Sequence, residues 1–170
     1  CDTSGRPLYA ANRELASPAE PHLALWHATT LLREHRGDGH VLALANAGFD
    51  PCEAHVTQVA ASGASLDTIR PYRGWGDDDW AAATDRLRTR GWLDRDGRLT
   101  PTGRAARDRV EEDTDRLASD PVDRLGDAVE SVVPVLRRVA TRLRETGTIP
   151  YPNPIGVPPH PSLRDPHHHR

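Results

Sequence analysis

The order of predicted elements between residues 77 and 118 constrains the fold of this chain more than any other feature. Three aspartates at 77–79 open the segment DDDWAAATDRLRTRG, and carboxylates favour the N-terminal turn of a helix. Apolar residues recur in this segment at the helical spacings of three and four: Trp80, Ala83 and Leu87. Gly91 is typical of a position just after a helix, so the pattern predicts a helix over residues 78–90.

The residues that follow predict a turn and a further helix. WLDRDGRLT, at 92–100, contains the pair Asp96 and Gly97, which favours the tight turn of a β-hairpin. PTGR then begins a helix over about 102–117, with proline near its first position. A short helix and a turn at 73–78 precede the whole unit. Because helix, turn, helix, hairpin and helix is the order of a winged helix, we predict a mainly α fold. It would be a winged helix-turn-helix with added helices and a small β-hairpin wing.

The composition excludes several classes of function. The formal net charge of -3 over 170 residues gives no overall attraction to nucleic acid or to anionic membranes, and leaves only a local basic patch open. Two cysteines, Cys1 and Cys52, do not make a disulfide framework. No apolar run is long enough to span a bilayer, and no signal-peptide pattern is present. We therefore expect a cytoplasmic protein without a membrane partner.

Breaks in the pattern divide the chain into five regions. Prolines and a glycine indicate that residues 1–21 form an irregular N-terminal arm. Helices over 22–62 precede the winged-helix segment at 63–118. Helical spacing then predicts one long C-terminal helix within 119–146, and a proline-rich tail follows at 147–170.

Several stretches resemble known sequences. RGWLDRDGRLTPTGRAARD resembles the end of the recognition helix, the wing and the following helix of MarR-type regulators. LYAANREL, LWHATTLLREHRGDGH, RGWGDDDW, EEDTDRLA and YPNPIG together are similar to an actinobacterial helix-turn-helix family. Members of that family usually carry a further helical region ahead of these stretches, so we expect the chain to correspond to their C-terminal portion. The resemblance implies a winged-helix fold and a role in DNA binding.

The segment REHRGDGH, at 33–40, concentrates ionisable groups after an apolar helix predicted over 22–34. Gly37 and Gly39 are expected to end that helix and to redirect the chain. Three interpretations stay open: a capped helix terminus, part of a small-molecule pocket, or a metal or haem site. The spacing matches no metal-binding signature, so we predict no metal ligands and leave the cofactor unknown.

A small-molecule pocket here would combine histidines, carboxylates and aromatic residues from several stretches of the chain. The candidate ligand-binding residues are Trp26, Glu34, His35, Arg36, Asp38, His40, His55, Trp75 and Asp115. In an enzyme, the candidates for acid–base catalysis would be His35 and His40. The carboxylates that orient them would be Glu34 and Asp38. For Asp115, a solvated helix face is the competing interpretation.

The helix predicted to read DNA has residues that oppose DNA binding and residues that favour it. The first residues of such a helix contact base edges, and here they are the aspartates at 77–79, which oppose binding to phosphates. Arg86 is the strongest candidate for reading a base, by bidentate contact to guanine. Arginines suited to phosphate contacts are Arg88, Arg90, Arg95 and Arg98. A solvated surface that balances the nearby aspartates is the alternative.

The predicted C-terminal helix carries an apolar seam at spacings of three and four. Its residues are Val122, Leu125, Val129, Val132, Leu136, Val139 and Leu143. Such a seam packs either against the chain's own core or across a homodimer.

Together these features predict a MarR-like winged-helix protein that binds a small molecule and acts as a ligand-responsive transcriptional regulator on duplex DNA. The alternative is a winged-helix relative that does not bind DNA. It would serve, through REHRGDGH, as an enzyme or a drug-sequestering protein, for instance in secondary metabolism.

Overall fold

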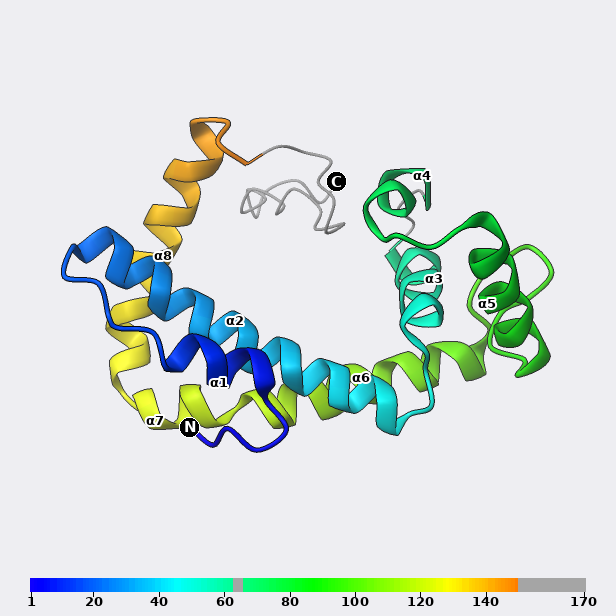
Figure 1. Cartoon of the computed structure of the whole chain (residues 1–170), viewed down its shortest axis with the longest axis horizontal. Coiled ribbons are helices and arrows are strands. Elements are labelled where there is room, and N and C mark those ends of the chain that lie inside the picture. The colour runs from blue at the N-terminus through cyan, green and yellow to red at the C-terminus, as the bar shows by residue number, and fades with distance from the viewer. Residues whose placement is uncertain (63–65, 150–170) are drawn as a thin grey trace, which may run out of the picture.

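The computed structural model describes residues 1–62 and 66–149, and it confirms a mainly α protein (Figure 1). In chain order the elements are α1 (Pro7–Arg13), α2 (Pro21–Asn46), α3 (Pro51–Ser62), α4 (Leu66–Ile69), the 3-10 helix η1 (Arg70–Tyr72), α5 (Asp77–Thr89), α6 (Pro101–Ala118), α7 (Asp120–Leu125) and α8 (Ala128–Glu145).

Two long helices form the frame of the molecule. Helix α2 packs along α6, and α1 packs against α2 (Figure 1). Helices α3 to α5 lie at one end of this frame and α8 lies at the other. No helix within the described ranges combines the length and apolar character needed to cross a bilayer.

The apolar core at the α3–α5 end joins α3 to α5, the helix that the sequence predicts to read DNA. Its buried residues are Cys52 and Val56 from α3, Trp80, Ala83 and Leu87 from α5, and Leu93. The three residues of α5 that the helical spacing singles out are therefore core residues, as the sequence predicts. A second cluster of Ala43, Phe49 and Val110 lies where α2 meets α6. Trp92 links the two clusters, with its ring centroid 4.7 Å from that of Phe49.

Helix α2 runs through both glycines of REHRGDGH, so the predicted helix end near residue 34 and the glycine hinge are wrong. The reason is a close approach between helices. A Cβ atom on Gly39 would lie 3.3 Å from Leu117 Cβ and 3.0 Å from Arg6 Nη1. Gly39 therefore lets α2 and α6 pack closely, and this packing outweighs the low helix propensity of glycine.

The N-terminal region is not irregular throughout. Helix α1 begins at Pro7, a residue favoured at the first helical position. Tyr9 is buried, and its backbone N–H donates to the Asp38 carboxylate of α2 at 2.9 Å. This contact with α2 stabilises a short helix that the prolines and the glycine of residues 1–21 do not predict.

The predicted β-hairpin wing is also wrong, because no strand forms in residues 66–149. A tight loop stands in its place, with one antiparallel bridge between Leu93 and Leu99. The Asp94 carboxylate accepts from the backbone N–H groups of Asp96 and Arg98, and Thr100 already caps α6. The hydrogen bonds of Asp94 and the start of α6 at Thr100 thus leave too few residues for two paired strands.

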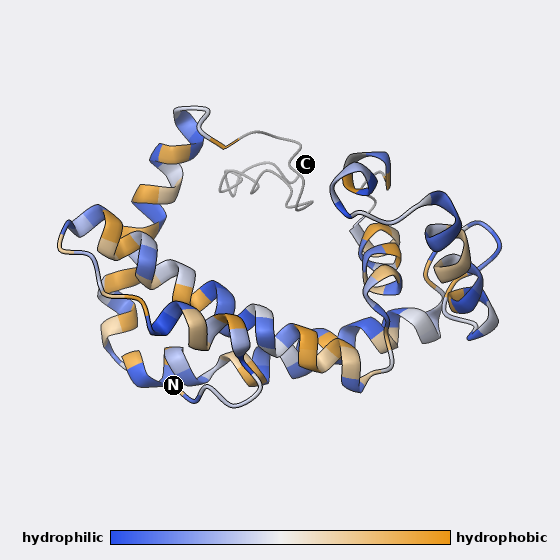
Figure 2. Ribbon diagram, viewed as in Figure 1, coloured by the Kyte–Doolittle hydropathy of each residue, from blue (hydrophilic) through white to orange (hydrophobic). Residues whose placement is uncertain are grey.

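The C-terminal region forms two helices instead of the predicted long one. Gly126, with φ 50° and ψ -133°, separates α7 from α8. Pro134 lies inside α8, and the helix continues past it. Hydrophobic and hydrophilic residues alternate along α8, none of its residues is buried, and its apolar seam is at least partly exposed (Figure 2). Most of the predicted proline-rich tail, with YPNPIG, lies outside the described residues.

Candidate ligand cavity and its link to helix α5

A cavity of about 590 Å³ lies between α2, α3 and α6. This volume is in the range of small-molecule sites in proteins. Its apolar walls are Val41, Leu44, Ala45, Phe49, Pro51 and Ala54. Its polar lining consists of Arg36, His40, Asp50, His55, Gln58, Arg73, Arg107 and Glu111. Apolar walls beside several polar and charged side chains suit a small organic ligand that has both apolar and polar groups.

His40 of α2 is held in a defined tautomer. Its Nδ1 lies 2.9 Å from the Thr114 hydroxyl oxygen, and that hydroxyl donates its only proton to the Val110 carbonyl at 2.6 Å. Nδ1 must therefore be the donor to Thr114, which leaves Nε2 as the acceptor of the neutral ring. Burial lowers the pKa of His40, although the carboxylate of Glu111 acts in the opposite direction. His40 consequently offers the cavity a neutral, hydrogen-bond-accepting imidazole near pH 7.

His55 of α3 contributes a second imidazole. Its Nδ1 lies 3.3 Å from the Gln58 side-chain oxygen, and its ring centroid lies 5.5 Å from that of Trp75. Burial lowers the pKa of His55, and the positive charge of Arg73 lowers it further. Trp75 in turn meets Trp80 of α5 edge to face, at 5.6 Å. The cavity wall is thus in contact with the aromatic core of the helix-turn-helix.

An ion-pair network borders the cavity on the α6 side. Glu111 accepts from Arg107 at 2.8 Å and from Arg36 at 3.3 Å. Arg36 also pairs with Asp115 at 3.6 Å. This network brings residues of REHRGDGH and of EEDTDRL together at one site.

The structure therefore unites only part of the predicted ligand-binding set. Arg36, His40 and His55 line the cavity. Trp75 joins them through His55, and Asp115 through Arg36. The remaining four residues lie elsewhere: Trp26, Glu34, His35 and Asp38.

The excluded residues lie on other faces of α2. His35 and His40 are five residues apart on a continuous helix, so their side chains point about 140° apart. His35 and Asp38 are buried and contact α1 through Tyr9. Glu34 pairs with Arg33, and Trp26 is 75% exposed. Of the four catalytic candidates, only His40 faces the cavity.

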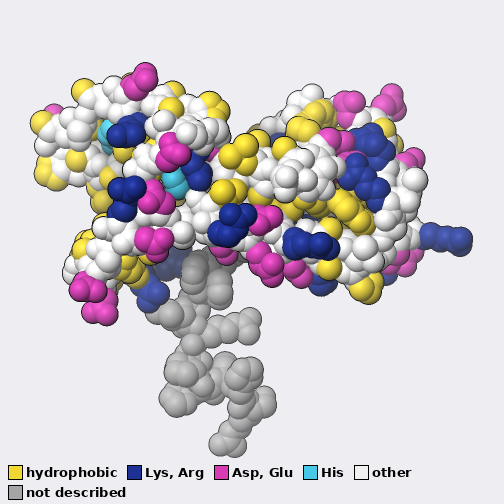
Figure 3. All heavy atoms as spheres, turned by 90° about the horizontal axis from the view of Figure 1, so that it is seen from below, with side chains coloured by type: hydrophobic (Ala, Val, Ile, Leu, Met, Phe, Trp, Pro, Cys, Tyr) yellow, Lys and Arg dark blue, Asp and Glu magenta, His cyan; other side chains and the backbone are white. Residues whose placement is uncertain are grey.

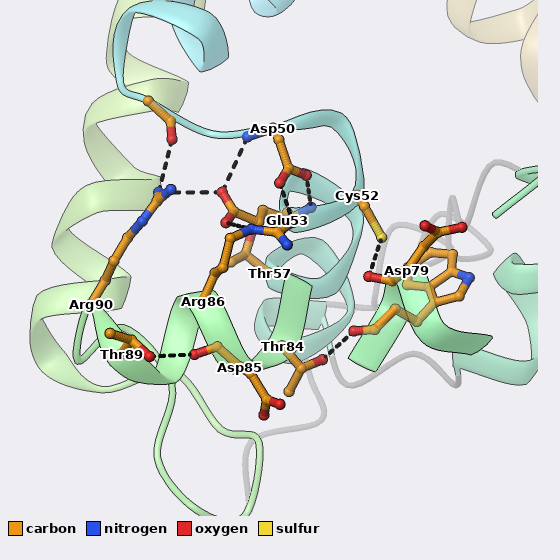
Figure 4. Close-up of polar contacts among 12 residues, drawn as sticks. Asp50, Cys52, Glu53, Thr57, Asp79, Thr84, Asp85, Arg86, Thr89 and Arg90 are labelled. Carbon is orange, nitrogen blue, oxygen red and sulfur yellow. Dashed lines mark hydrogen bonds and ion pairs between the residues drawn. The ribbon is translucent and has the colours of Figure 1, made fainter. Parts of the chain in front are cut away.

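Asp50 connects the cavity to α5. It lines the cavity, and its carboxylate accepts from the Glu53 backbone N–H at 2.8 Å and from the guanidinium of Arg86 (Figure 4). Burial by itself would raise the pKa of Asp50, but these hydrogen bonds, the positive charge of Arg86 and the Cys52 backbone N–H together outweigh burial and hold the pKa below its usual value. Asp50 is therefore an anion that caps α3 and binds α5 at the same time.

Glu53 of α3 is the second carboxylate that links α3 to α5. Its side chain has no exposed surface. It accepts from Arg86 Nε at 3.0 Å, from the Asp50 backbone N–H at 3.1 Å, and pairs with Arg90 Nη1 at 3.2 Å (Figure 4). The sequence marks Glu53 only as an acid in the first turn of a helix; the buried position of its carboxylate depends on α5.

The arginines predicted to contact DNA are mostly engaged within the protein. Arg86 and Arg90 pair with α3, and Arg98 pairs with Asp96. Arg88 pairs with Asp85 and donates to carbonyls of the 92–100 loop. On the face drawn in Figure 3, basic and acidic side chains are interspersed instead of forming one basic patch. DNA contact by these residues stays a prediction.

Comparison with known proteins identifies a family. Searches of curated proteins and of solved structures found no match. The sequence pattern of a helix-turn-helix family matches residues 1–150, which contain α3, α5 and the cavity. The chain therefore belongs to this helix-turn-helix family.

Proposed function

We propose that the protein is a ligand-responsive, DNA-binding transcriptional regulator of the MarR-like type, active in the cytoplasm. The observation that carries this proposal is the double role of Asp50, which lines the cavity and binds Arg86 of α5. Family membership supports the DNA-binding part, because helix-turn-helix modules characteristically read DNA.

The coupling would run through the first turns of α3. A ligand in the cavity contacts Asp50, Pro51, Ala54 and His55, all near the start of this helix. Helix α3 holds α5 through the Glu53 ion pairs and the shared apolar core. A ligand that binds one orientation of α3 better than another therefore shifts the equilibrium between the two orientations of α3. Because α5 is held by α3, the equilibrium between the orientations of α5 shifts with it.

A homodimer through the α8 seam fits this function. Regulators of this kind bind two half-sites, which needs two copies of α5 related by symmetry. Val132, Val139 and Leu143 are each more than a third exposed. Helix α8 lies at the end of the frame away from α5, so pairing through α8 would leave both reading helices free (Figure 1).

The proposal is tested by fluorescence anisotropy with labelled DNA from the region upstream of the protein's own gene. We expect specific binding that weakens steeply with salt. Anilinonaphthalene sulfonate, an amphiphilic anion, serves as the cavity probe: its fluorescence should rise on binding, and saturating probe should alter the affinity for DNA.

A cavity-filling variant separates the two halves of the proposal. Ala45→Trp should abolish probe binding and the probe's effect on DNA affinity, while leaving DNA binding itself intact. Ala105→Trp, at an exposed position of α6 outside the cavity, is the matched control and should behave as the wild type. DNA binding that is indifferent to the probe in every variant would contradict the coupling.

The alternative function is a small-molecule-binding protein or enzyme that has lost DNA binding. The observation that favours it is the combination of a neutral His40 acceptor in the cavity with arginines of α5 already engaged in ion pairs. Probe binding without specific binding to any DNA fragment would support this alternative.

A further inference from the structure

Three side chains with metal-binding atoms converge on the side of α2 that faces α1 and α7. They are Cys1 from the N-terminal segment, His35 from the middle of α2 and Asp120 from the start of α7. One ligand atom from each lies within 4.8 Å of the other two. This cluster is separate from the cavity that carries the proposed function.

His35 supplies an independent reason to look for a ligand at this cluster. The residue is 2% exposed, and its Nδ1 is buried without a hydrogen-bond partner in the described part of the chain. A buried polar atom in a folded protein is ordinarily satisfied, so an unsatisfied imidazole nitrogen calls for an explanation. The ring is also fixed in place, because the Tyr9 ring meets it edge to face at 5.0 Å.

We propose that Cys1, His35 and Asp120 bind one divalent transition-metal ion, with zinc the best match. Thiolate, imidazole and carboxylate are the donor types that zinc combines. Ligand atoms about 2.0–2.3 Å from a tetrahedral zinc ion lie about 3.3–3.8 Å from one another. Cys1 and Asp120 are only partly buried, so small side-chain rotations can close the observed spacing.

The remaining contacts of the cluster are compatible with an ion. Asp120 accepts from Arg124 Nε at 2.8 Å through Oδ1, which leaves Oδ2 for the metal. Binding displaces the thiol proton of Cys1, which passes to solvent. Three protein ligands leave a fourth coordination position open. A neighbouring cavity of about 340 Å³, lined by Cys1, His35 and the apolar residues Leu31, Leu32 and Leu125, gives water or a small ligand access to that position.

Cobalt(II) titration tests this proposal, because a cobalt–thiolate bond gives a charge-transfer absorption in the near ultraviolet. The background is the full chain with His167→Gln, His168→Gln and His169→Gln, which removes the competing run of imidazoles. We expect one equivalent of cobalt or zinc per chain, with the charge-transfer band. Cys1→Ser should abolish the band, and Asp120→Asn should weaken affinity by at least about tenfold, as loss of a metal contact does.

Two control variants make the result specific. Arg124→Gln removes the ion pair of Asp120 but no ligand, and Cys52→Ser removes the other thiol; both should keep the band. His35→Gln removes the third ligand and should weaken affinity as Asp120→Asn does. Circular dichroism checks that each variant is folded, and Asp120→Asn, at a partly exposed position, decides the outcome if His35→Gln fails to fold. A missing band, a band that survives Cys1→Ser, or affinity unchanged by Asp120→Asn would each overturn the proposal.

Discussion

Arg86 of α5 donates a hydrogen bond from Nε to Oε1 of Glu53, a carboxylate of α3 with no exposed surface, over 3.0 Å. Arg86, which the sequence predicts to be the strongest base reader, thus belongs to the ion-pair network that joins α3 to α5. Its hydrogen bonds to Asp50 and Glu53 raise its pKa further above an already high value, so the guanidinium is permanently charged. A change of DNA affinity on mutating Arg86 must therefore be separated from a change of fold.

Replacing Glu53 tests how much the ion pairs between α3 and α5 contribute to stability. Glu53→Ala should lower the free energy of unfolding by about 2–4 kcal/mol, because it removes a buried acceptor shared by two arginines and the α3 cap. Arg86→Ala should cost less than Glu53→Ala, because Arg90 still pairs with Glu53 and Arg86 is partly solvated. Urea denaturation measures both, and Glu112→Gln, at an exposed position of α6, should change nothing.

Replacing Arg95 tests DNA contact and leaves the ion pairs between α3 and α5 intact. Its side chain is exposed in the 92–100 loop, and it forms no ion pair with the residues that the structure describes. Arg95→Ala should keep the unfolding free energy, lower DNA affinity and reduce the slope of log affinity against log salt by about 1. Unchanged affinity and slope would show that the loop does not approach the phosphates.

The two glycines of REHRGDGH should respond in opposite directions to the same substitution. Gly37→Ala should stabilise the protein by about 0.5–1 kcal/mol, since alanine favours a helix and only the Glu34 carboxylate lies near, at 3.9 Å. Gly39→Ala should destabilise it, because the new Cβ would meet Leu117 and Arg6. Thermal denaturation of the pair distinguishes helix packing from a hinge: in a hinge, both substitutions would be destabilising.

Stability should fall as the pH drops below about 6.5. Burial lowers the pKa values of His40 and His55 in the folded protein below the usual histidine value of 6.5, so the unfolded chain takes up protons first as the pH falls. Stability is therefore lost as pH falls through 6.5 and levels off below the folded pKa values. Around His40, Glu111 opposes this effect, whereas Arg36 and Arg107 reinforce it. Melting temperatures at about pH 5.5 and about pH 7.5 should differ less in His40→Gln than in the wild type.

The α8 seam predicts how the oligomeric state responds to charge. Val132→Asp with Val139→Asp places two carboxylates on the apolar seam and should convert a dimer into a monomer, without loss of helical content. Thr141→Asp, at an exposed position of α8 off the seam, is the control. Sedimentation velocity gives the masses. A wild type that is monomeric at high concentration would contradict the proposed dimer.

Local patterns in the sequence were sufficient to predict α5, α6 and the buried face of α5. Trp80, Ala83 and Leu87 are buried on α5 as their spacing predicts, because an amphipathic helix can bury only its apolar face. The predicted starts of α5 and α6 lie within one position of the observed starts. The same local logic failed at Gly37, Gly39 and the 92–100 loop.

Only the tertiary structure decided which polar residues work together. REHRGDGH is one segment in the sequence, but α2 turns His40 toward the cavity and His35 toward α1. Glu53 becomes the centre of a buried network only because α5 places Arg86 and Arg90 against it. Cys1 and Asp120, far apart in the sequence, meet beside His35. Helix propensity depends on neighbours along the chain, and the sequence alone therefore determined α5 and α6. A site depends on which helix faces meet across the fold, and this is set by long-range packing that no local spacing encodes.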